Sequence, residues 1–330
     1  MSMKVVSRST DQILPDVSVV IPTYNRISML KEAIATVLNQ TFAGNTEIIV
    51  IDDNSKDGTP KTIQEQYPDI YLIACSENHG PAAARNQGIR AAKGRYIAFL
   101  DSDDLWESDY LQTQIDALDQ QSATQANCFS VSDVWLWKTE KDIRIHCKQG
   151  KHPDFSSFLH HLLAAGSFIH TPSAAVFPRQ AFDRQDLFNE SLRFAEDTDL
   201  YIRLIIDGYQ PIFTRKPLVT RRKHGQGQAI EFKNIDRRIQ NRINILQQYY
   251  PAIKGDQIDI SLEEIRAQIY SQFATQCYRS QHFLKWASLL QTSADYTSWQ
   301  AVWPRIKHDI GFTTRRLSSF LQKWRTIKSV

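Results

Sequence analysis

The stretch "VSVVIPTYNRISML" (residues 17–30) decides the fold, because a short β-rich run passes directly into a segment with helical periodicity. The run 17–21 is continuously apolar, which is typical of a strand buried on both faces. From residue 29 onward, apolar side chains recur at intervals of three and four residues: Met29, Leu30, Ala33, Ile34, Val37 and Leu38. The stretch therefore predicts one β-α unit of a parallel sheet.

The same alternation continues to residue 100. Three more apolar runs follow, each separated from the next by a segment with helical character: 47–51, 70–75 and 96–100. Four β-α repeats predict an α/β protein with a mostly parallel, doubly wound sheet covered on both faces. Ligands of such sheets bind at the carboxyl ends of the strands.

The pattern changes after a helix expected near 107–121. We expect a mixed, more antiparallel half of the sheet from strands at 127–137, 142–147 and 173–177, with helices at 156–165 and 196–206. Beyond residue 226 the chain becomes helical and Gln-rich, with helices expected at about 231–249, 261–277 and 281–293. The sequence thus predicts two domains, residues 1–225 and a helical C-terminal region, residues 226–330.

Composition narrows the class of protein. The chain has 330 residues, 42% of them hydrophobic, and a formal net charge of +3, which is ordinary for a globular protein. Four cysteines stand far apart without a C-x-x-C pair, which argues against a zinc site or a disulfide framework and favours a reducing cytosol. With no signal sequence and no run of about 18 apolar residues, we expect a cytoplasmic protein without a membrane span or a nucleic-acid partner.

Each of the four expected strands ends in a polar segment rich in turn-forming residues: "PTYNR" (22–26), "DDNSKDGT" (52–59), "ENHGPAAARN" (77–86) and "DSDD" (101–104). A single segment of this kind would indicate only a turn. Four in register, two of them acidic, indicate a ligand site at one edge of the sheet.

In this order the segments resemble glycosyltransferase family 2, the nucleotide-sugar transferases of the so-called GT-A fold. The resemblance also includes "EDTDL" (196–200) downstream, and it covers roughly residues 15–225. It implies a GT-A type sheet whose mixed half lies on the acceptor side. It further implies a nucleotide-sugar donor, a glycan or lipid-linked acceptor, and Mn²⁺ or Mg²⁺ as cofactor.

Asp101 and Asp103 are the candidate metal ligands. Residues i and i+2 of an extended segment share a face, so these two carboxylates point one way and Asp104 points the other. Carboxylate oxygens suit Mg²⁺ or Mn²⁺, which keep positions open for substrate phosphates. The resemblance assigns Asp103 to the metal, Asp101 to the metal's surroundings or the ribose, and Ser102 to the nucleotide-sugar site. The alternative is a solvated turn before a helix, and Asp104 is assigned to that turn in either case.

Asp53 resembles the family's carboxylate that accepts the N3–H of uracil, with Asp52 beside it as support. An imide N–H can be recognised only by an acceptor, which makes a carboxylate suitable for the task. Pro22, Thr23 and Tyr24 would line the same base or ribose site, with Tyr24 offering a stacking face. The alternatives are that "DDNSKDGT" is only a turn and helix start, and that Tyr24 is a partly buried tyrosine at a strand end.

Asp197 is the candidate catalytic base. It shares helical spacing with three apolar residues, Leu200, Tyr201 and Leu204, and is therefore expected on the inner face of its helix. Glu196 and Asp199 are expected to point elsewhere. The helix dipole and free N–H groups at the helix start would keep the carboxylate ionised. The alternative is a capping acid, and the "ED" pair of the family favours Asp197 as the base of an inverting displacement.

Four further side chains complete the expected site. Arg85 could reach the diphosphate or the donor sugar, or form a surface ion pair. His224 resembles a family histidine that completes the metal or diphosphate site, although it could equally be a surface residue. Trp106 and Thr171, together with Glu196, are candidates for contact with the acceptor, although a Trp at a helix start usually packs.

The C-terminal segment 312–328 combines a basic surface with one apolar face that includes Trp324. This pattern fits either a helix lying on a membrane surface or a terminal helix packed on its own domain. The membrane alternative would place the protein at the inner face of the membrane, where a lipid-linked acceptor would be found.

The sequence thus predicts a metal-dependent inverting glycosyltransferase, a hexosyl- or N-acetylhexosaminyltransferase, that uses a UDP-sugar to build a surface glycan or exopolysaccharide. A sugar nucleotidyltransferase is the first alternative, but it would carry a Gly-rich phosphate loop after its first strand, and "IPTYNR" (21–26) has no glycine. A non-catalytic nucleotide-sugar-binding relative is the second alternative.

Overall fold

The computed structural model describes residues 14–122, 127–183, 187–224, 234–253, 258 and 260–310. The chain forms two compact units. The first comprises residues 1–150, 169–200 and 207–225, and the second comprises residues 151–168, 201–206 and 226–330. The domain limits expected from the sequence, 1–225 and 226–330, stay predictions.

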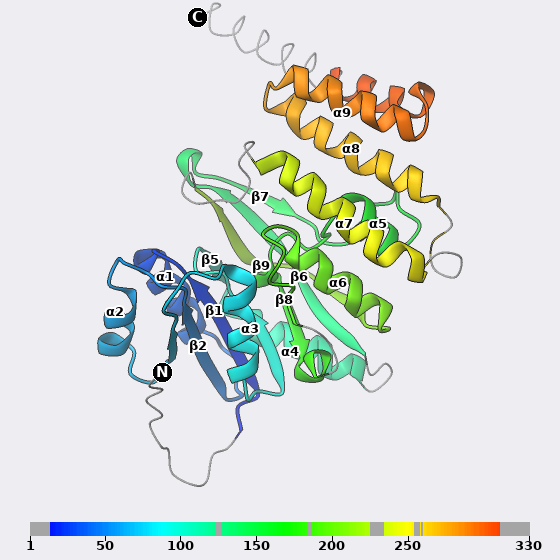
Figure 1. Cartoon of the computed structure of the whole chain (residues 1–330). Helices are drawn as coiled ribbons and strands as arrows, with labels where there is room; N and C mark the ends of the chain where they lie inside the picture. Colours follow the sequence, from blue (N-terminus) through cyan, green and yellow to red (C-terminus); the bar gives the residue numbers. More distant parts are fainter. Residues whose placement is uncertain are drawn as a thin grey trace, which may run out of the picture. The chain divides into compact units, whose positions relative to one another are not determined.

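The first unit contains the parallel half of the sheet, with the strands in the order β3-β2-β1-β4 (Figure 1). Their bounds are β1 (Val17–Thr23), β2 (Thr46–Asp52), β3 (Tyr71–Ala74) and β4 (Tyr96–Phe99). Each strand coincides with a predicted apolar run, and every residue of β1 and β4 is buried. The predicted parallel α/β sheet is confirmed.

Three helices connect these strands: α1 (Ile27–Leu38), α2 (Thr59–Gln66) and α3 (Pro81–Ala91). Crossovers between parallel strands are right-handed. Because the chain runs outward from β1 to β3 and then returns to β4, α1 and α2 cover one face of these strands and α3 covers the other (Figure 1). Helix α3 lies so close that a Cβ added at Gly88 would stand 2.3 Å from Cγ1 of Val20.

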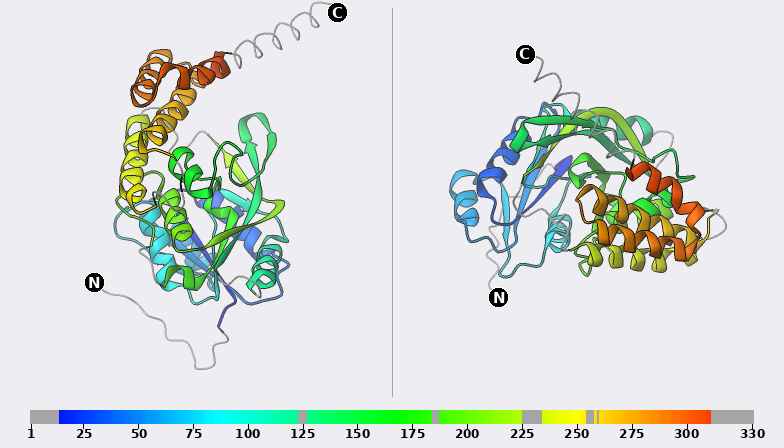
Figure 2. Two further views of the ribbon diagram at one scale, coloured as in Figure 1. Left: turned by 90° about the vertical axis from the view of Figure 1, so that its right-hand side faces the viewer. Right: turned by 90° about the horizontal axis from the view of Figure 1, so that it is seen from above.

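The second half of the sheet is mixed, as predicted. Beyond β4 the order continues β8-β6-β9-β5, and β7 pairs with the outer part of β6. The bounds are β5 (Asp104–Trp106), β6 (Cys128–Lys138), β7 (Ile143–Cys147), β8 (Ala175–Pro178) and β9 (Gln210–Lys223). Strand β8 is antiparallel to β4 and β6, while β9 is parallel to β6 and antiparallel to β5. Figure 2 shows the β6–β7 hairpin, in green, projecting beyond the parallel strands.

Strands β5 and β9 are absent from the sequence-based expectation. Strand β9 contains Pro211 and Pro217 and eight other residues that are not apolar, so it lacks the pattern of a buried strand. Its register with β6 is interrupted on either side of Asp133, where Pro217 lies opposite. Strand β5 has only three residues and exists because it pairs with β9, more than 100 residues away in the chain.

The remaining helices of the first unit include α4 (Tyr110–Ser122), which corresponds to the helix predicted at 107–121. Short 3₁₀ turns are η1 (Thr139–Lys141), η2 (Pro172–Ala174) and η3 (Arg179–Phe182). Helix α6 (Glu196–Ile206) begins in the first unit and ends in the second.

The second unit is helical, as predicted for the C-terminal extension. Its helices are α5 (Phe158–Ala165), α7 (Ile235–Ile253), α8 (Leu262–Arg279) and α9 (Phe283–Tyr296), followed by a helix over 299–310. Ser261 and Glu264 form a capping box at the start of α8. In the part of the chain that is described, no helix is long and apolar enough to cross a membrane. The predicted basic helix at 312–328 lies outside the described residues.

Candidate functional site

The first two strand ends are joined by hydrogen bonds at the carboxyl edge of the sheet. The N–H of Asp53 donates to the carbonyl oxygen of Thr23 at 2.9 Å, and the N–H of Asn25 donates to Oγ of Ser55 at 2.8 Å. Asn25 and Asn54 have φ angles of 51° and 67°, a left-handed conformation that Asn adopts more readily than most residues. The "YN" and "DN" pairs therefore supply the sharp turns that bring these two junctions together.

Thr23 and Asp52 are partners in the register of β1 and β2, so their side chains lie on the same face. Both residues are buried, and Oγ1 of Thr23 and Oδ1 of Asp52 have no hydrogen-bond partner among the described residues. The other oxygen of Asp52 accepts the N–H of Ser55 at 3.0 Å. Pro22 is buried beside them, whereas Tyr24 is 47% exposed. Two unpaired polar atoms thus lie where the sequence predicts the nucleoside.

Asp53 holds the third junction in place. Its carboxylate accepts the N–H of His79 at 2.9 Å and the N–H of Gly80 at 2.8 Å, one on each oxygen. Asn78 donates to the carbonyl oxygen of the same residue at 3.1 Å. Since Gly80 immediately precedes α3, the buried Asp53 carboxylate fixes the start of that helix. The predicted contact of Asp53 with uracil stays a prediction.

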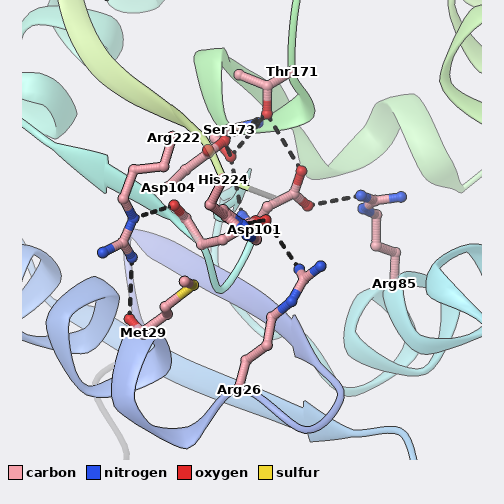
Figure 3. Close-up of polar contacts among 10 residues, drawn as sticks. Arg26, Met29, Arg85, Asp101, Asp104, Thr171, Ser173, Arg222 and His224 are labelled. Carbon is pink, nitrogen blue, oxygen red and sulfur yellow. Dashed lines mark hydrogen bonds and ion pairs between the residues drawn. The ribbon is translucent and has the colours of Figure 1, made fainter. Parts of the chain in front are cut away.

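Arg85 lies in α3 and connects the end of β4 with the start of α6. Its Nη2 donates to Oδ1 of Asp101 at 2.7 Å, and its Nη1 donates to Oε1 of Glu196 at 3.1 Å. The side chain is only 5% exposed, and the two carboxylates raise the pKa of the guanidinium. The charge of Arg85 lowers the pKa of Asp101 despite its burial. Arg85 is therefore a buried bridge rather than a surface ion pair, and Figure 3 shows its contact with Asp101.

Asp103 contacts basic side chains from two distant segments. Oδ2 of Asp103 lies 2.9 Å from Nε2 of His224 and 3.0 Å from Nη1 of Arg26. Nε of the buried Arg222 donates to the backbone carbonyl of Asp103. Figure 3 labels the three partners Arg26, Arg222 and His224. The structure thus brings together the predicted pair Asp103 and His224, and adds Arg26 and Arg222, which the sequence does not single out.

Asp103 and His224 fit a divalent ion as two of its ligands. One contributes a carboxylate oxygen and the other an imidazole nitrogen, a donor set that suits Mn²⁺. Nδ1 of His224 is buried and has no hydrogen-bond partner among the described residues. No cluster of three metal-capable side chains occurs in the described part of the chain. Ions of this class, however, commonly take one or two protein ligands and complete their shell with water and substrate phosphates.

Asp104 is not part of a solvated turn, contrary to the expectation from its sequence position. It belongs to β5, is 2% exposed, and its Oδ2 accepts hydrogen bonds from Oγ1 of Thr171 and Oγ of Ser173, both at 2.7 Å. Burial, together with the charges of Asp101 and Asp103, raises the pKa of Asp104 to about 7. The pairing of β5 with β9 turns this side chain inward, and no local pattern in "DSDD" reveals that pairing.

Helix α6 begins with a cluster of acids close to Arg85. Ala195, just before it, has a φ of 65°, an uncommon conformation for a residue with a Cβ. Burial raises the pKa of Glu196 to about 7 and also raises the pKa of Asp197. Desolvation outweighs the hydrogen bond from Thr198 in setting the pKa of Asp197, and the expectation that the helix start keeps this carboxylate ionised stays a prediction. The expectation that Glu196 and Asp199 point away is wrong, since Glu196 binds Arg85 and Asp199 is 1% exposed.

Two of the three residues expected at the acceptor, Trp106 and Thr171, are buried. Trp106 is 4% exposed, stacks on Tyr110 at 4.2 Å between ring centroids, and donates from Nε1 to the carbonyl oxygen of Ser173 at 2.9 Å. Thr171 is buried as well and caps η2. Both therefore support the loop beneath Asp101 and Asp104. Ser102, expected at the nucleotide, is also buried.

Comparison with solved structures supports the fold. The structure is similar to the Staphylococcus aureus TarS fragment 1–349 in complex with UDP-GlcNAc, with a TM-score of 0.59, 15% identity and coverage of 90% of this chain and 92% of that one. It is also similar to the mannosyltransferase PcManGT of Pyrobaculum calidifontis in complex with GDP-Man and Mn²⁺. In that comparison the TM-score is 0.54 and the identity 21%, over 96% of this chain and 84% of the other. The GT-A type fold predicted from the sequence is thereby confirmed.

Comparison of sequences identifies the family. The succinoglycan biosynthesis protein ExoO of Rhizobium meliloti is 41% identical over 111 residues, which are 33% of this chain and 32% of ExoO. The chain thus spans about a third of the length of that relative. The family model "Glycosyl transferase family 2" matches residues 18–185, which include all four strand-end segments and the loop of Thr171. With its motifs gathered at one edge of a GT-A type sheet, the chain belongs to glycosyltransferase family 2.

Proposed function

We propose that this chain is a metal-dependent inverting glycosyltransferase that moves a sugar from a UDP-sugar to an acceptor hydroxyl. One observation carries the proposal. The buried bridge from Asp101 through Arg85 to Glu196 places the acidic end of β4 and the acidic start of α6 within the span of a single guanidinium. A candidate metal ligand region and a candidate base thus lie in one site, as a displacement at a sugar carbon requires.

The donor nucleoside would bind at the ends of β1 and β2. Oγ1 of Thr23 and Oδ1 of Asp52, both without a partner among the described residues, supply a donor and an acceptor for a base or ribose. Tyr24, 47% exposed, offers its ring for stacking. UDP is favoured because a carboxylate matches the imide N–H of uracil, and because the similar TarS fragment was solved with UDP-GlcNAc. A hexosyl or N-acetylhexosaminyl group is the sugar expected with such a donor.

Asp103 and His224 would hold Mn²⁺ or Mg²⁺, with Asp101 beside them. A bound ion of this kind supplies Lewis-acid stabilisation of the charge that develops on a departing diphosphate. Arg26, which contacts Asp103 at 3.0 Å, is placed to donate hydrogen bonds to the same phosphates. Arg85 keeps Asp101 ionised and fixed, because its charge lowers the pKa of that carboxylate.

Asp197 would take the proton of the acceptor hydroxyl. The acceptor oxygen then forms a bond to the anomeric carbon while the bond from that carbon to the diphosphate oxygen breaks on the opposite side, which inverts the configuration. A general base is most effective when its pKa lies near the working pH. The raised pKa of Asp197 moves this carboxylate in that direction.

The expected product is a surface glycan or exopolysaccharide, and the name of ExoO as a succinoglycan biosynthesis protein supports this class. A glycan or lipid-linked acceptor, a cytoplasmic location and a peripheral contact with the membrane through 312–328 stay part of the proposal. Lys and Arg account for five of the residues from 312 to 328 and no acid occurs there, so that segment has the charge expected for anionic lipid.

A donor panel tests the proposal. Hydrolysis of UDP-, GDP- and dTDP-sugars is measured with Mn²⁺ and with a chelator, and the chain is expected to release UDP from one UDP-sugar only with the metal. Preference for a GDP-sugar would reject the assignment of uracil. Release of pyrophosphate from a nucleoside triphosphate and a sugar phosphate would instead identify a sugar nucleotidyltransferase, and binding without turnover would identify a non-catalytic relative.

A further inference from the structure

Strands β6, β7 and β9 carry a further group of aligned side chains outside the candidate functional site. In the register of these strands, Leu136 lies between Ile145 and Arg221, and Lys138 lies between Ile143 and Lys223. Partners in a register share a face, and so do residues two apart on one strand. These six residues therefore form one surface, the Leu136–Lys223 face.

The Leu136–Lys223 face is continuous with the proposed active site. Arg221 is also the register partner of Asp104 in β5, so the row of Ile145, Leu136 and Arg221 ends at the buried acid beneath Asp101. Oγ1 of Thr171 lies 2.7 Å from Oδ2 of Asp104 and 3.3 Å from Oδ2 of Asp101. Arg85 in turn joins Asp101 to Glu196, the neighbour of Asp197 in the chain. A molecule lying along this face would thus have one end at the candidate base.

The charge of this face has one sign. Its polar members are Arg221, Lys138 and Lys223, and none of the three forms an ion pair with a described residue. No acid occurs among its six positions. The opposite face of the same strands is different, because Arg144 lies over the ring of Trp137 at 5.0 Å and Arg222 pairs with Glu32. The three positively charged side chains of the Leu136–Lys223 face are therefore available to bind an anionic group outside the described residues.

The apolar members of this face are also accessible. Ile143 is 46% exposed and Ile145 is 40% exposed, although both belong to a regular strand. Aliphatic side chains beside cations offer contacts for the C–H faces of sugar rings together with contacts for anionic groups.

We propose that the Leu136–Lys223 face binds the acceptor, and that this acceptor is a glycan with negatively charged groups along its chain. Charge complementarity selects this occupant, because the three cations lie in two successive rows of side chains about 7 Å apart along the strands. A repeating anionic chain can meet both rows while its terminal hydroxyl reaches Asp197. This inference rests on the proposed glycosyltransferase function and names the chemical class of its acceptor.

The test measures binding of fluorescently labelled oligogalacturonate, a carboxylate-bearing glycan, to the full chain, with a neutral malto-oligosaccharide of equal length as comparison. Wild-type protein is expected to bind the anionic glycan more tightly than the neutral one. The affinity for the anionic glycan is expected to fall as the salt concentration is raised. Lys138→Gln combined with Lys223→Gln is expected to weaken this binding about five- to tenfold, since each exposed ion pair contributes a modest amount. Neither residue belongs to the proposed catalytic machinery.

A matched control removes two charges from the same hairpin but not from this face: Lys141→Gln in the turn and Arg144→Gln on the opposite side. The control is expected to bind the anionic glycan as wild type does. Equal weakening in both double variants would overturn the inference, because it would show dependence on overall charge only. Equal binding of anionic and neutral glycans by wild type, or binding to vesicles of anionic phospholipid in place of the glycan, would overturn it as well.

Titration of UDP in the presence of Mn²⁺ on the same preparations separates the two proposals. Binding of UDP by wild type and by both double variants, with glycan binding weakened only in Lys138→Gln/Lys223→Gln, supports both. If UDP binds and the anionic glycan does not, the acceptor inference fails alone. If UDP does not bind, the proposed function itself fails.

Discussion

Nη2 of Arg85 lies 2.7 Å from Oδ1 of Asp101 in the candidate functional site. The same guanidinium contacts Glu196 at 3.1 Å through Nη1. One residue of α3 thus sets the spacing between the acids that follow β4 and the acids that begin α6. Loss of this side chain would leave two carboxylates without their cation.

Substitution of Arg85 by Met is expected to lower the free energy of unfolding by about 3 kcal/mol, because removing one partner of a buried ion pair leaves an uncompensated charge. Urea unfolding measures this effect. The matched control is Arg90→Met in the same helix, whose side chain is 61% exposed and whose loss should change stability by less than about 0.5 kcal/mol. Equal effects at the two positions would show that the bridge does not hold the site together.

Glu196 is expected to make stability depend on pH. Burial raises its pKa from 4.5 to about 7, so between these values the folded protein keeps a proton that the unfolded chain has lost. The free energy of unfolding should therefore fall, through this group, as the pH rises from about 4.5 to about 7.

The variant Glu196→Gln should show a smaller fall in stability over this range, because the amide stays neutral. Thermal unfolding at pH 5 and pH 8 provides the measurement, with the exposed Glu140→Gln as control. A variant whose pH dependence matched that of the wild-type chain would contradict a raised pKa at Glu196.

Asp197→Asn is expected to lower kcat by about 10²- to 10⁴-fold, the usual contribution of a general base. Affinity for UDP should be retained, since the proposed role is toward the acceptor. The control is Asp207→Asn, which removes an exposed carboxylate just after the same helix. Full activity of Asp197→Asn would exclude this residue as the base.

Asp53→Asn is expected to cost about 1–3 kcal/mol of stability and to weaken UDP binding. An Asn side chain has one acceptor oxygen, so it can serve only one of the N–H groups of His79 and Gly80 that the carboxylate now accepts. Denaturant unfolding and UDP titration check the two effects. The exposed Asp69→Asn serves as control, and a stable Asp53→Asn with normal UDP affinity would argue against both roles.

Much of the fold can be predicted from the sequence because its parallel half is encoded locally. Strands β1 to β4 are apolar runs, and the helices between them carry periodic apolar stripes. Strand β9 could not be predicted in this way, since its partners β5 and β6 lie about 80 to 115 residues away and two prolines interrupt its pattern. The alternation of side-chain directions expected along "DSDD" (101–104) likewise fails at Asp104, because the pairing of β5 with β9 sets the direction of that side chain.

The candidate site likewise has features that the sequence indicates and features that it does not. Its position at the strand ends, and the proximity of Asp103 to His224, agree with what the motifs indicate. The sequence does not indicate that Arg85 would be buried between two acids, because ion pairing over 111 residues leaves no local signal. The rise in the pKa of Asp197 is missed for a related reason, since desolvation depends on which segments cover the residue.

Calorimetric titration of UDP, with and without Mn²⁺, into the wild-type chain and Asp103→Asn tests the central claim most directly. We predict that Mn²⁺ strengthens UDP binding to the wild-type chain, and that Asp103→Asn loses this dependence while its melting temperature stays close to that of the wild type. UDP binding that is indifferent to Mn²⁺, or that keeps its metal dependence in Asp103→Asn, would contradict a metal-assisted nucleotide-sugar site at the carboxyl ends of these strands.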